Sequence, residues 1–307
     1  MGLVAPSAAP LRMAGCAQRR RMANDPEEDA ALSKLASYYN NKIAVVTGAG
    51  SGIGRAIAQH LGALGARVYC TDVDGAAAQR VAEGLPNAAG EALDVTDAAA
   101  LAAFAERVYA REGRVDLLFN NAGVGHAGRV EDTELADWRW VFEVNLMGVV
   151  HGIHAFLPRM LAQPGRGHIV NTASGAGLIP MPRTAPYCAS KHAVVGLSQS
   201  LAAELAGRNV DVTILCPGTI DTAIIRNTRM RGAGAEQRQS RAVEYYARRG
   251  VSPDRVAADV LTDISKGRLF CVTPRSEVGV GWLLQRLSPR LMQRIMRARM
   301  DKVEATD

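Results

Sequence analysis

Tyr187 and Lys191 lie four residues apart, and this spacing suits proton transfer. On a helix, positions i and i+4 lie one turn apart on one face, so the Lys191 ammonium can reach the Tyr187 phenol. An ordinary phenol has a pKa of about 10, and a neighbouring cation favours the phenolate. Ser174, thirteen positions earlier, can hold a substrate oxygen near that phenol. We therefore expect proton exchange with an alcohol or carbonyl oxygen, although the same pair is also common in ordinary amphipathic helices.

A glycine-rich turn further upstream is a candidate nucleotide site. The apolar run from Ile43 to Val46 predicts a buried parallel strand, and residues 53–64 predict the helix that follows it. Glycines let the backbone approach a pyrophosphate, whose charge is met by free amides at the helix N-terminus. Gly48, Gly52 and Gly54 give the spacing G-x-x-x-G-x-G. Because these glycines lie between a strand and a helix, nucleotide binding is favoured over an ordinary glycine-rich loop.

Asp72 bears on which nucleotide is bound. It ends the second predicted strand, 24 residues beyond Gly48, where an acid usually accepts hydrogen bonds from the adenosine ribose. A carboxylate there would repel a 2′-phosphate, and residues 48–54 contain no Arg or Lys to attract one. We expect NAD as cofactor and NADP to be disfavoured. Asp72 can alternatively cap the next helix, or do both.

With these motifs in order, the chain resembles the short-chain dehydrogenase/reductase family over roughly residues 42 to 275. The likeness rests on the glycine turn after Thr47, then Asp94-Val95, Asn120 to Gly123, Asn145, Ser174, Tyr187 with Lys191, Pro217-Gly218 and Thr222. The resemblance implies that Tyr187 is the general acid/base and Lys191 its cationic partner and ribose anchor. It also implies that Ser174 orients the substrate oxygen and that Asn145 supports a proton relay. The implied cofactor contacts are Gly48, Ser51, Gly52, Ile53, Gly54, Asp72, Asp94, Val95, Asn121, Ala122, Gly123, Tyr187, Lys191, Pro217, Gly218, Ile220 and Thr222.

Apolar runs alternate with helical stretches from residue 43 to residue 273 without a linker, which predicts one α/β domain. The expected fold is a Rossmann-like, doubly wound, seven-stranded parallel sheet. Five scattered cysteines fit a reducing compartment and no zinc spacing. No metal site is expected, and no run of 18 apolar residues predicts a membrane span, so we expect a cytoplasmic protein. The strands are predicted near 43–47, 67–72, 90–94, 115–120, 167–173, 210–215 and 268–273.

Two extensions flank the predicted domain 42–275. Residues 1–41 hold four arginines and no acid before Asp25, and three interpretations stay open: an unstructured or misassigned leader, a targeting segment, or a docked helix. Residues 276–307 are basic and amphipathic, which suits a helix on a membrane surface or one packed on a partner subunit or on the body. Ser288 and Pro289 are predicted to begin a second helix there. The apolar positions of the whole stretch, on both sides of Pro289, are Leu284, Leu287, Leu291 and Ile295.

The net charge of +6 is concentrated in a few segments. Residues 226–249 carry seven arginines and two acids, and residues 282–300 carry five arginines and no acid. Without aromatic interleaving or a known binding module, this pattern does not predict nucleic-acid binding. By resemblance, residues 222–250 are the loop that closes over the substrate. Its arginines either meet an anionic substrate such as a CoA or carrier-protein thioester or form a solvated helix face.

The predicted function is therefore NAD-dependent interconversion of a secondary alcohol and a ketone, on a lipophilic substrate of steroid, terpenoid or hydroxyacyl type. The alternatives are a 3-oxoacyl thioester reductase using NADPH, which Asp72 disfavours, and a non-catalytic dinucleotide-binding scaffold or sensor, which the intact catalytic set disfavours. Apolar helices near 138–161 and 186–206 resemble the family's four-helix bundle, so we expect a homodimer or homotetramer. The expected pocket residues are apolar: Val124, Leu178, Ile179, Met181, Ile224 and Ile225.

Overall fold

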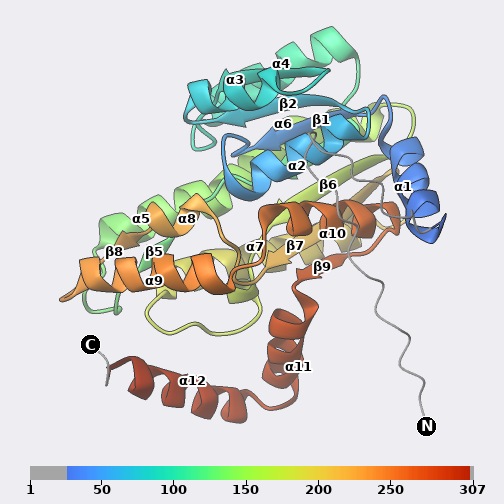
Figure 1. The fold of residues 1–307 in the computed structure, drawn as a ribbon. Helices are drawn as coiled ribbons and strands as arrows, with labels where there is room; N and C mark the ends of the chain where they lie inside the picture. The colour runs from blue at the N-terminus through green and yellow to red at the C-terminus, as the bar shows by residue number, and fades with distance from the viewer. Residues whose placement is uncertain (1–25, 305–307) are drawn as a thin grey trace.

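The computed structural model describes residues 26–304, and its centre is a sheet of seven parallel strands in the order β3-β2-β1-β4-β6-β7-β9 (Figure 1). The predicted Rossmann-like sheet is confirmed, with the third strand two residues earlier than expected. The order reverses between β1 and β4, and ligands of such sheets bind at the carboxyl ends of the strands beside that reversal. The strands are β1 (Ile43–Thr47), β2 (Arg67–Asp72), β3 (Ala88–Ala92), β4 (Leu117–Asn120), β6 (Gly167–Thr172), β7 (Val210–Pro217) and β9 (Phe270–Thr273).

Helices cover both faces of the sheet because its central strands are apolar on both sides. All five residues of β1 and all six of β6 are buried. Buried side chains of α2, α3 and α10 form the core on one face, and those of α4, α6 and α7 form the core on the other. The helices are α1 (Pro26–Tyr39), α2 (Gly52–Ala63), α3 (Gly75–Glu83), α4 (Ala98–Glu112), α5 (Leu135–Phe142), α6 (Gly148–Ala162), α7 (Ala185–Glu204), α8 (Ala223–Arg226), α9 (Ala235–Arg249), α10 (Pro253–Ser265), α11 (Val280–Leu287) and α12 (Pro289–Glu304).

The helix predicted near 138–161 is longer and interrupted. A π-helical turn, Glu143–Met147, joins α5 to α6. The joined helix Leu135–Ala162 is long and apolar enough to cross a membrane by length and composition. In this fold Phe156 and Met160 of its second half are buried in the core with Ile169 of β6. One side of the helix is therefore part of the core, while 33% of its most apolar 18-residue window is buried.

A small second sheet lies beside the large one, where β5 (His126–Ala127) pairs in parallel with β8 (Arg229–Met230). This pairing ties the segment after β4 to the segment expected to close over the substrate. The segment 222–250 is thus an ordered structure made of α8, β8 and α9 rather than an open loop.

At the amino-terminal side, α1 packs on α10. Tyr39 is fully buried, and its hydroxyl donates a 2.6 Å hydrogen bond to the Leu261 carbonyl. Of the three interpretations of the leader, residues 26–39 match the docked helix, while residues 1–25 lie outside the described part of the chain. At the other end, Ser288 and Pro289 begin α12 as predicted.

Candidate active site

The glycine turn lies at the carboxyl end of β1, as its sequence predicts. Gly48 has a φ of +65°, and a Cβ there would lie 2.8 Å from the Ala122 Cα. A side chain at Gly54 would clash with the Gly48 carbonyl, so the turn tolerates only bare backbone. Ser51 occupies the N-cap position of α2 without a side-chain capping bond. The first amides of α2 therefore have no side-chain partner, which fits an anion such as a pyrophosphate.

Asp72 lies directly against this turn. Its Oδ2 accepts a 2.9 Å hydrogen bond from the Gly50 amide, and its Oδ1 accepts one of 3.0 Å from the Asp74 amide. The cap of α3 is instead Asp74, whose carboxylate accepts from the Ala77 amide. The alternative that Asp72 caps the next helix is therefore wrong. Both Asp72 oxygens keep lone pairs that can accept from a ribose.

Thr47 joins the first and fourth strands at the site, a role that the sequence did not reveal. Its hydroxyl oxygen accepts from the Asn121 amide at 3.0 Å and the Ala122 amide at 3.1 Å. In return, the Asn121 side-chain amide donates to the Thr47 carbonyl at 3.1 Å. The only sequence feature that pointed to this role was the position of Thr47 directly before the first glycine of the turn. These hydrogen bonds fix the spacing between the glycine turn and residues 121–123.

The other predicted cofactor residues gather around the same edge. Thr222 lies against the glycine turn, since a Cβ at Gly52 would be 3.2 Å from its Cγ2. Gly218 donates to the Thr273 carbonyl at 2.8 Å, and Ile220 is buried. Val95 is buried too, whereas the exposed Asp94 accepts two bonds from Thr96. Of the remaining positions, Ile53 packs on the core below the turn and Pro217 ends β7.

Tyr187 and Lys191 project from the first turns of α7 toward the ends of β4 and β6. The Tyr187 phenol lies close enough to the Ser174 hydroxyl for that hydroxyl to lower the phenol's pKa. The Lys191 ammonium lies 5.9 Å from the centroid of the Tyr187 ring and donates a 2.9 Å bond to the Thr172 carbonyl. Lys191 is almost fully buried, and its Nζ is 3.4 Å from the Cβ position of Gly123. The structure thus brings the predicted hydroxyl, phenol and ammonium to the same place.

The electrostatics of this group differ from the sequence-based expectation. Burial raises the pKa of the Tyr187 phenol, and the hydrogen bond with Ser174 offsets part of that rise. Burial also lowers the pKa of Lys191 to about 8, because a charged ammonium is poorly solvated there. The expectation that Lys191 holds the pKa of Tyr187 below its ordinary value is therefore not met in this structure. Both groups are biased toward their neutral forms.

Asn145 lies in the π-helical turn and is fully buried. Its Oδ1 accepts a 2.8 Å hydrogen bond from the Val124 amide, and its Nδ2 donates to the Val124 carbonyl at 3.0 Å. Nδ2 also donates to the Ser190 hydroxyl at 3.2 Å, and Ser190 donates to the Tyr187 carbonyl at 2.8 Å. Asn145 is thus linked to the turn of α7 that carries Tyr187. Ser190 is a second residue that the sequence analysis missed, and only its place in the Tyr-to-Lys turn pointed to it.

A further tyrosine reaches the site from α9. Burial and the nearby Tyr187 phenol raise the pKa of Tyr246 to about 12, and Glu277 contributes to the same rise. Glu277 accepts a 2.6 Å hydrogen bond from the Thr219 hydroxyl. Tyr246 is therefore near enough to the Tyr187 phenol and to Glu277 to interact electrostatically with both. No sequence signal singled it out among the arginines of α9.

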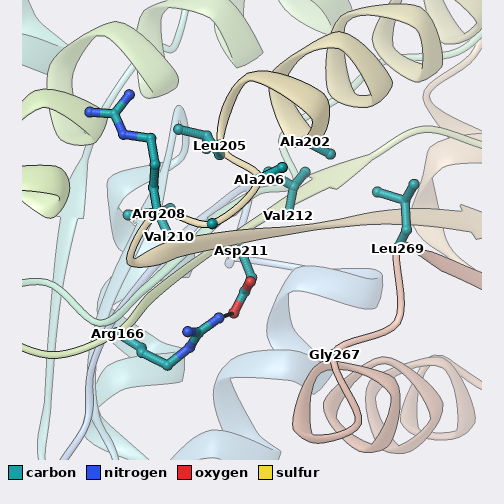
Figure 2. A pocket seen from close by; sticks show the side chains of 11 residues that line it. Arg166, Ala202, Leu205, Ala206, Arg208, Val210, Asp211, Val212, Gly267 and Leu269 are labelled. Carbon is teal, nitrogen blue, oxygen red and sulfur yellow. Dashed lines mark hydrogen bonds and ion pairs between the residues drawn. The ribbon is translucent and has the colours of Figure 1, made fainter.

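The apolar residues expected to line the pocket differ in how far they are buried. Leu178 is buried in the core, whereas Met181 is 40% exposed. Ile224 and Ile225 lie on the short helix α8. A cavity of about 280 Å³ lies elsewhere, lined by Leu205, Val210 and Leu269 beside the Arg166–Asp211 ion pair (Figure 2). It opens at the amino ends of β6 and β7, away from Tyr187, and is not part of the candidate active site.

No group of three or more metal-ligating side chains occurs among residues 26–304. His151, three residues before His154 on α6, contacts the Val95 carbonyl at 2.9 Å through Nδ1. The candidate site consists of a glycine turn at the end of β1 beside a phenol, a hydroxyl and an ammonium.

Comparison with known proteins agrees with this geometry. Residues 42–232 match the short chain dehydrogenase family model. The chain belongs to the short-chain dehydrogenase family. It is 36% identical over 281 residues to the Mycobacterium bovis protein named "Probable oxidoreductase EphD", covering 88% of this chain and 47% of that one. The chain thus spans about half the length of that relative.

Two further relatives bear on chemistry. A short-chain dehydrogenase from Burkholderia phymatum, solved in complex with NAD, superposes with a TM-score of 0.77 at 36% identity, covering 82% of this chain and 95% of that one. A cyclohexanol dehydrogenase from an Acinetobacter species is 37% identical over 196 residues, covering 62% of this chain and 78% of that protein. Members of this family with similar sequences therefore bind NAD or act on a secondary alcohol.

Proposed function

We propose that the protein is an NAD-dependent oxidoreductase that interconverts a secondary alcohol and a ketone. The observation that carries the proposal is the convergence of Tyr187, Ser174 and Lys191 beside the glycine turn. A phenol and a hydroxyl that lie close together offer two contacts to one substrate oxygen. The arrangement suits proton transfer at that oxygen while its carbon changes oxidation state.

Tyr187 exchanges the proton with the substrate oxygen, and Ser174 holds that oxygen in place. The raised pKa of Tyr187 keeps the phenol protonated at neutral pH, so it is ready to donate to a carbonyl oxygen. Lys191, on the same side of α7, has its Nζ beside Gly123 and donates to the Thr172 carbonyl, which suits a role in holding the cofactor next to the phenol. Asn145 acts as a positioning residue, because its bonds to Val124 and Ser190 fix the two segments that frame the phenol.

The residues that would hold the dinucleotide are the glycine turn for the pyrophosphate, Asp72 for the adenosine ribose, and Lys191 for the nicotinamide ribose. NAD, when bound, supplies the hydride acceptor for alcohol oxidation. Asp72 disfavours NADP because a 2′-phosphate would approach its carboxylate, and the next residue, Val73, is apolar and 75% exposed. The NAD complex of the Burkholderia phymatum relative supports the same choice.

A lipophilic substrate follows from the side chains near Tyr187. Leu178, Ile179 and Met181 precede α7, and Ile224 and Ile225 lie on α8. The similarity to a cyclohexanol dehydrogenase is in keeping with a cyclic or long-chain secondary alcohol. We further propose a cytoplasmic homodimer or homotetramer built on α5, α6 and α7, for which light scattering is the direct measurement.

The test is a rate screen with NAD and NADP against cyclic, steroid and long-chain secondary alcohols, and against 3-oxoacyl thioesters with NADH and NADPH. We expect NAD-dependent oxidation of at least one apolar secondary alcohol. Exclusive NADPH-dependent reduction of thioesters would overturn both the cofactor and the substrate proposals. Tight NAD binding without turnover on any substrate would favour a non-catalytic scaffold.

A further inference from the structure

The C-terminal helices α11 and α12 stand away from the sheet (Figure 1). Exposed apolar side chains form a ridge along them. Val280, Leu283 and Leu287 of α11 and Leu291 of α12 are between 44% and 75% exposed. The spacing of the first three places them on one side of α11. Large apolar side chains gathered in this way mark an interaction surface rather than ordinary scattered exposure.

This ridge is held in a fixed position by contacts on the opposite side. Val278 is buried in the core, and the Trp282 ring packs against Phe270 of β9 with centroids 4.8 Å apart. On α12, Met292 and Met296 are buried. The extension therefore has a satisfied inner face, and the exposed leucines belong to a second, outer face.

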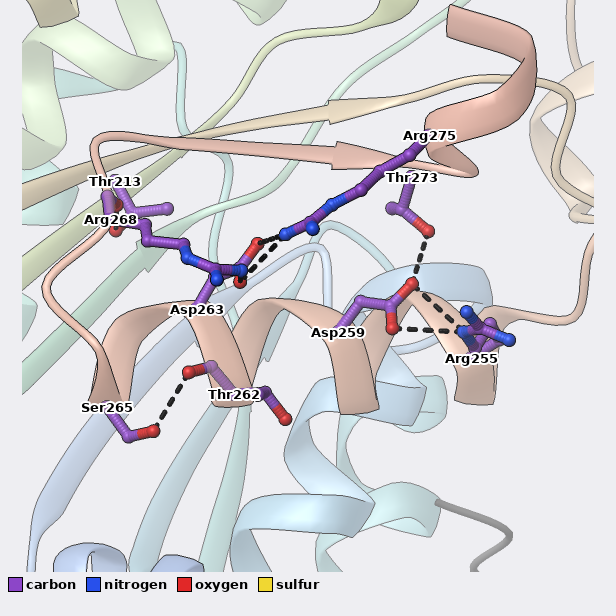
Figure 3. A network of polar contacts seen from close by, with 9 residues as sticks. All are labelled: Thr213, Arg255, Asp259, Thr262, Asp263, Ser265, Arg268, Thr273 and Arg275. Atoms are coloured by element: carbon purple, nitrogen blue, oxygen red, sulfur yellow. Dashed lines mark hydrogen bonds and ion pairs between the residues drawn. The ribbon is translucent and has the colours of Figure 1, made fainter. Parts of the chain in front are cut away.

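Ion pairs secure the start of the extension to the body. Arg275 donates to both carboxylate oxygens of Asp263 on α10, at 3.3 and 3.5 Å, and Arg268 donates to the same carboxylate at 2.6 Å (Figure 3). Asp263 is only 3% exposed. Because the anchor lies immediately before α11, the outer face is presented at a defined orientation.

The charges of residues 280–300, which carry the ridge, have one sign, and the first acids beyond them in α12 are Asp301 and Glu304. Arg286, Arg290, Arg294 and Arg297 are exposed, and none of them forms an ion pair with any residue of the described chain. No acidic residue occurs between positions 278 and 300. Such a surface is complementary to a partner that is both apolar and negatively charged. Exposed leucines flanked by arginines are the pattern of a helix that lies at the interface of a lipid bilayer.

A second copy of the chain fits this surface less well. A two-fold contact places the same patch of both copies together. It would gather exposed arginines from both copies of α11 and α12, with no acid among residues 278–300 to balance them. Repulsion between these arginines opposes such a contact, whereas anionic lipid headgroups would neutralise their positive charge.

We propose that the outer face of α11 and α12 docks the protein on anionic membrane surfaces. Leu283, Leu287 and Leu291 enter the boundary between headgroups and acyl chains, and the four arginines contact the headgroups. The same extension adjoins the substrate side of the molecule, since Gly281 lies beside Ile179 and Met292. The docking itself does not depend on the proposed reaction.

The test uses the full chain in co-sedimentation with vesicles of phosphatidylcholine alone and with 30% phosphatidylglycerol. We expect binding to the anionic vesicles that weakens in high salt, and little binding to the neutral ones. Arg290→Gln with Arg294→Gln should weaken binding roughly 25-fold, about fivefold for each cation near an anionic surface. Leu283→Gln with Leu287→Gln should weaken it at least tenfold.

The matched controls are Arg248→Gln with Arg249→Gln on α9 and Leu135→Gln on α5, all at exposed positions, which should bind like wild type. Circular dichroism shows whether every variant is folded, and this measurement does not depend on enzymatic activity. Equal binding to neutral vesicles, or full binding by both α11 and α12 variants, would overturn the proposal. It would also be overturned if vesicles were not bound and the leucine variant instead formed a smaller oligomer in light scattering, since a second copy would then cover the ridge.

Discussion

The Arg231 guanidinium donates two hydrogen bonds to the Asp137 carboxylate, at 2.8 Å from Nε and 3.0 Å from Nη2. Asp137 belongs to α5 and is fully buried, and Arg231 follows β8 in the substrate segment. The pair lowers the pKa of Asp137, chiefly through these bonds. His126 belongs to β5, the strand that pairs with β8, and its Nε2 lies 3.5 Å from the same carboxylate. One buried carboxylate thus holds the substrate segment against the body.

Arg231→Ala should therefore loosen the substrate segment, because it removes the guanidinium that pairs with the buried Asp137 carboxylate. We expect faster amide hydrogen exchange over residues 222–250 and a KM raised several-fold with a smaller change in kcat. Arg248→Ala, which removes an exposed arginine of α9 paired with Glu244, is the matched control. Unchanged exchange in the Arg231 variant would show that the β5–β8 pairing alone holds the segment.

Tyr187→Phe should lower kcat by a factor of about 10² to 10⁴, the range typical for loss of a general acid/base. The dissociation constant for NAD should stay within a few-fold, since the ring and the position of Lys191 are kept. Tyr245→Phe on α9, where the side chain is 56% exposed, should behave like wild type. A Tyr187 variant that retains more than a tenth of the rate would remove this residue from the proton-transfer step.

Asp72→Ala should weaken NAD and improve the relative use of NADP by at least tenfold. The change removes a charged acceptor for the ribose, worth about 1.5 to 3 kcal/mol per hydrogen bond, and it also removes a repulsion against the phosphate. Asp74→Ala removes a carboxylate only two residues away that caps α3. It should cost about 1 kcal/mol of stability without changing the cofactor ratio. A wild-type preference for NADPH would contradict the assignment of Asp72.

His168 should make the protein less stable in mild acid. Its Nε2 lies 2.8 Å from the Thr213 hydroxyl, which gives its own proton to the Arg268 carbonyl, so the imidazole must donate. Burial lowers the pKa of His168 to about 4. The neutral form's contribution is fully present above the unfolded pKa of about 6.5 and is lost as the pH falls toward the folded value.

Because of this histidine, the free energy of unfolding should fall by about 2 kcal/mol when the pH is lowered from 7 to 5. Urea unfolding at the two pH values measures the loss, and His168→Gln should reduce it by that amount because glutamine can donate without titrating. His192→Gln at an exposed position of α7 is the matched control. An identical pH dependence in wild type and the His168 variant would mean that His168 does not titrate in this range.

The strands and the site were predictable from sequence because each depends on a local pattern. Short apolar runs place β1 and β6, and the position of Asp72 at the end of β2 follows from its distance to the glycine turn. The pKa of Tyr187 was not predictable, since it depends on burial contributed by segments far apart in the chain. The same is true of Tyr246, which reaches the site only because α9 lies across it, and of Thr47, whose hydroxyl meets amides more than 70 residues away.

The π-helical turn between α5 and α6 imposes a constraint on the length of that helix. Each residue of an α-helix turns the chain by about 100°, so an extra residue in one turn sets the angle between everything before it and everything after it. Deleting one residue there would rotate Asp137 away from Arg231 or carry Asn145 away from Val124. An evolving chain can change the side chains of this turn but cannot shorten it by one residue without giving up either the anchor of the substrate segment or the support of the phenol.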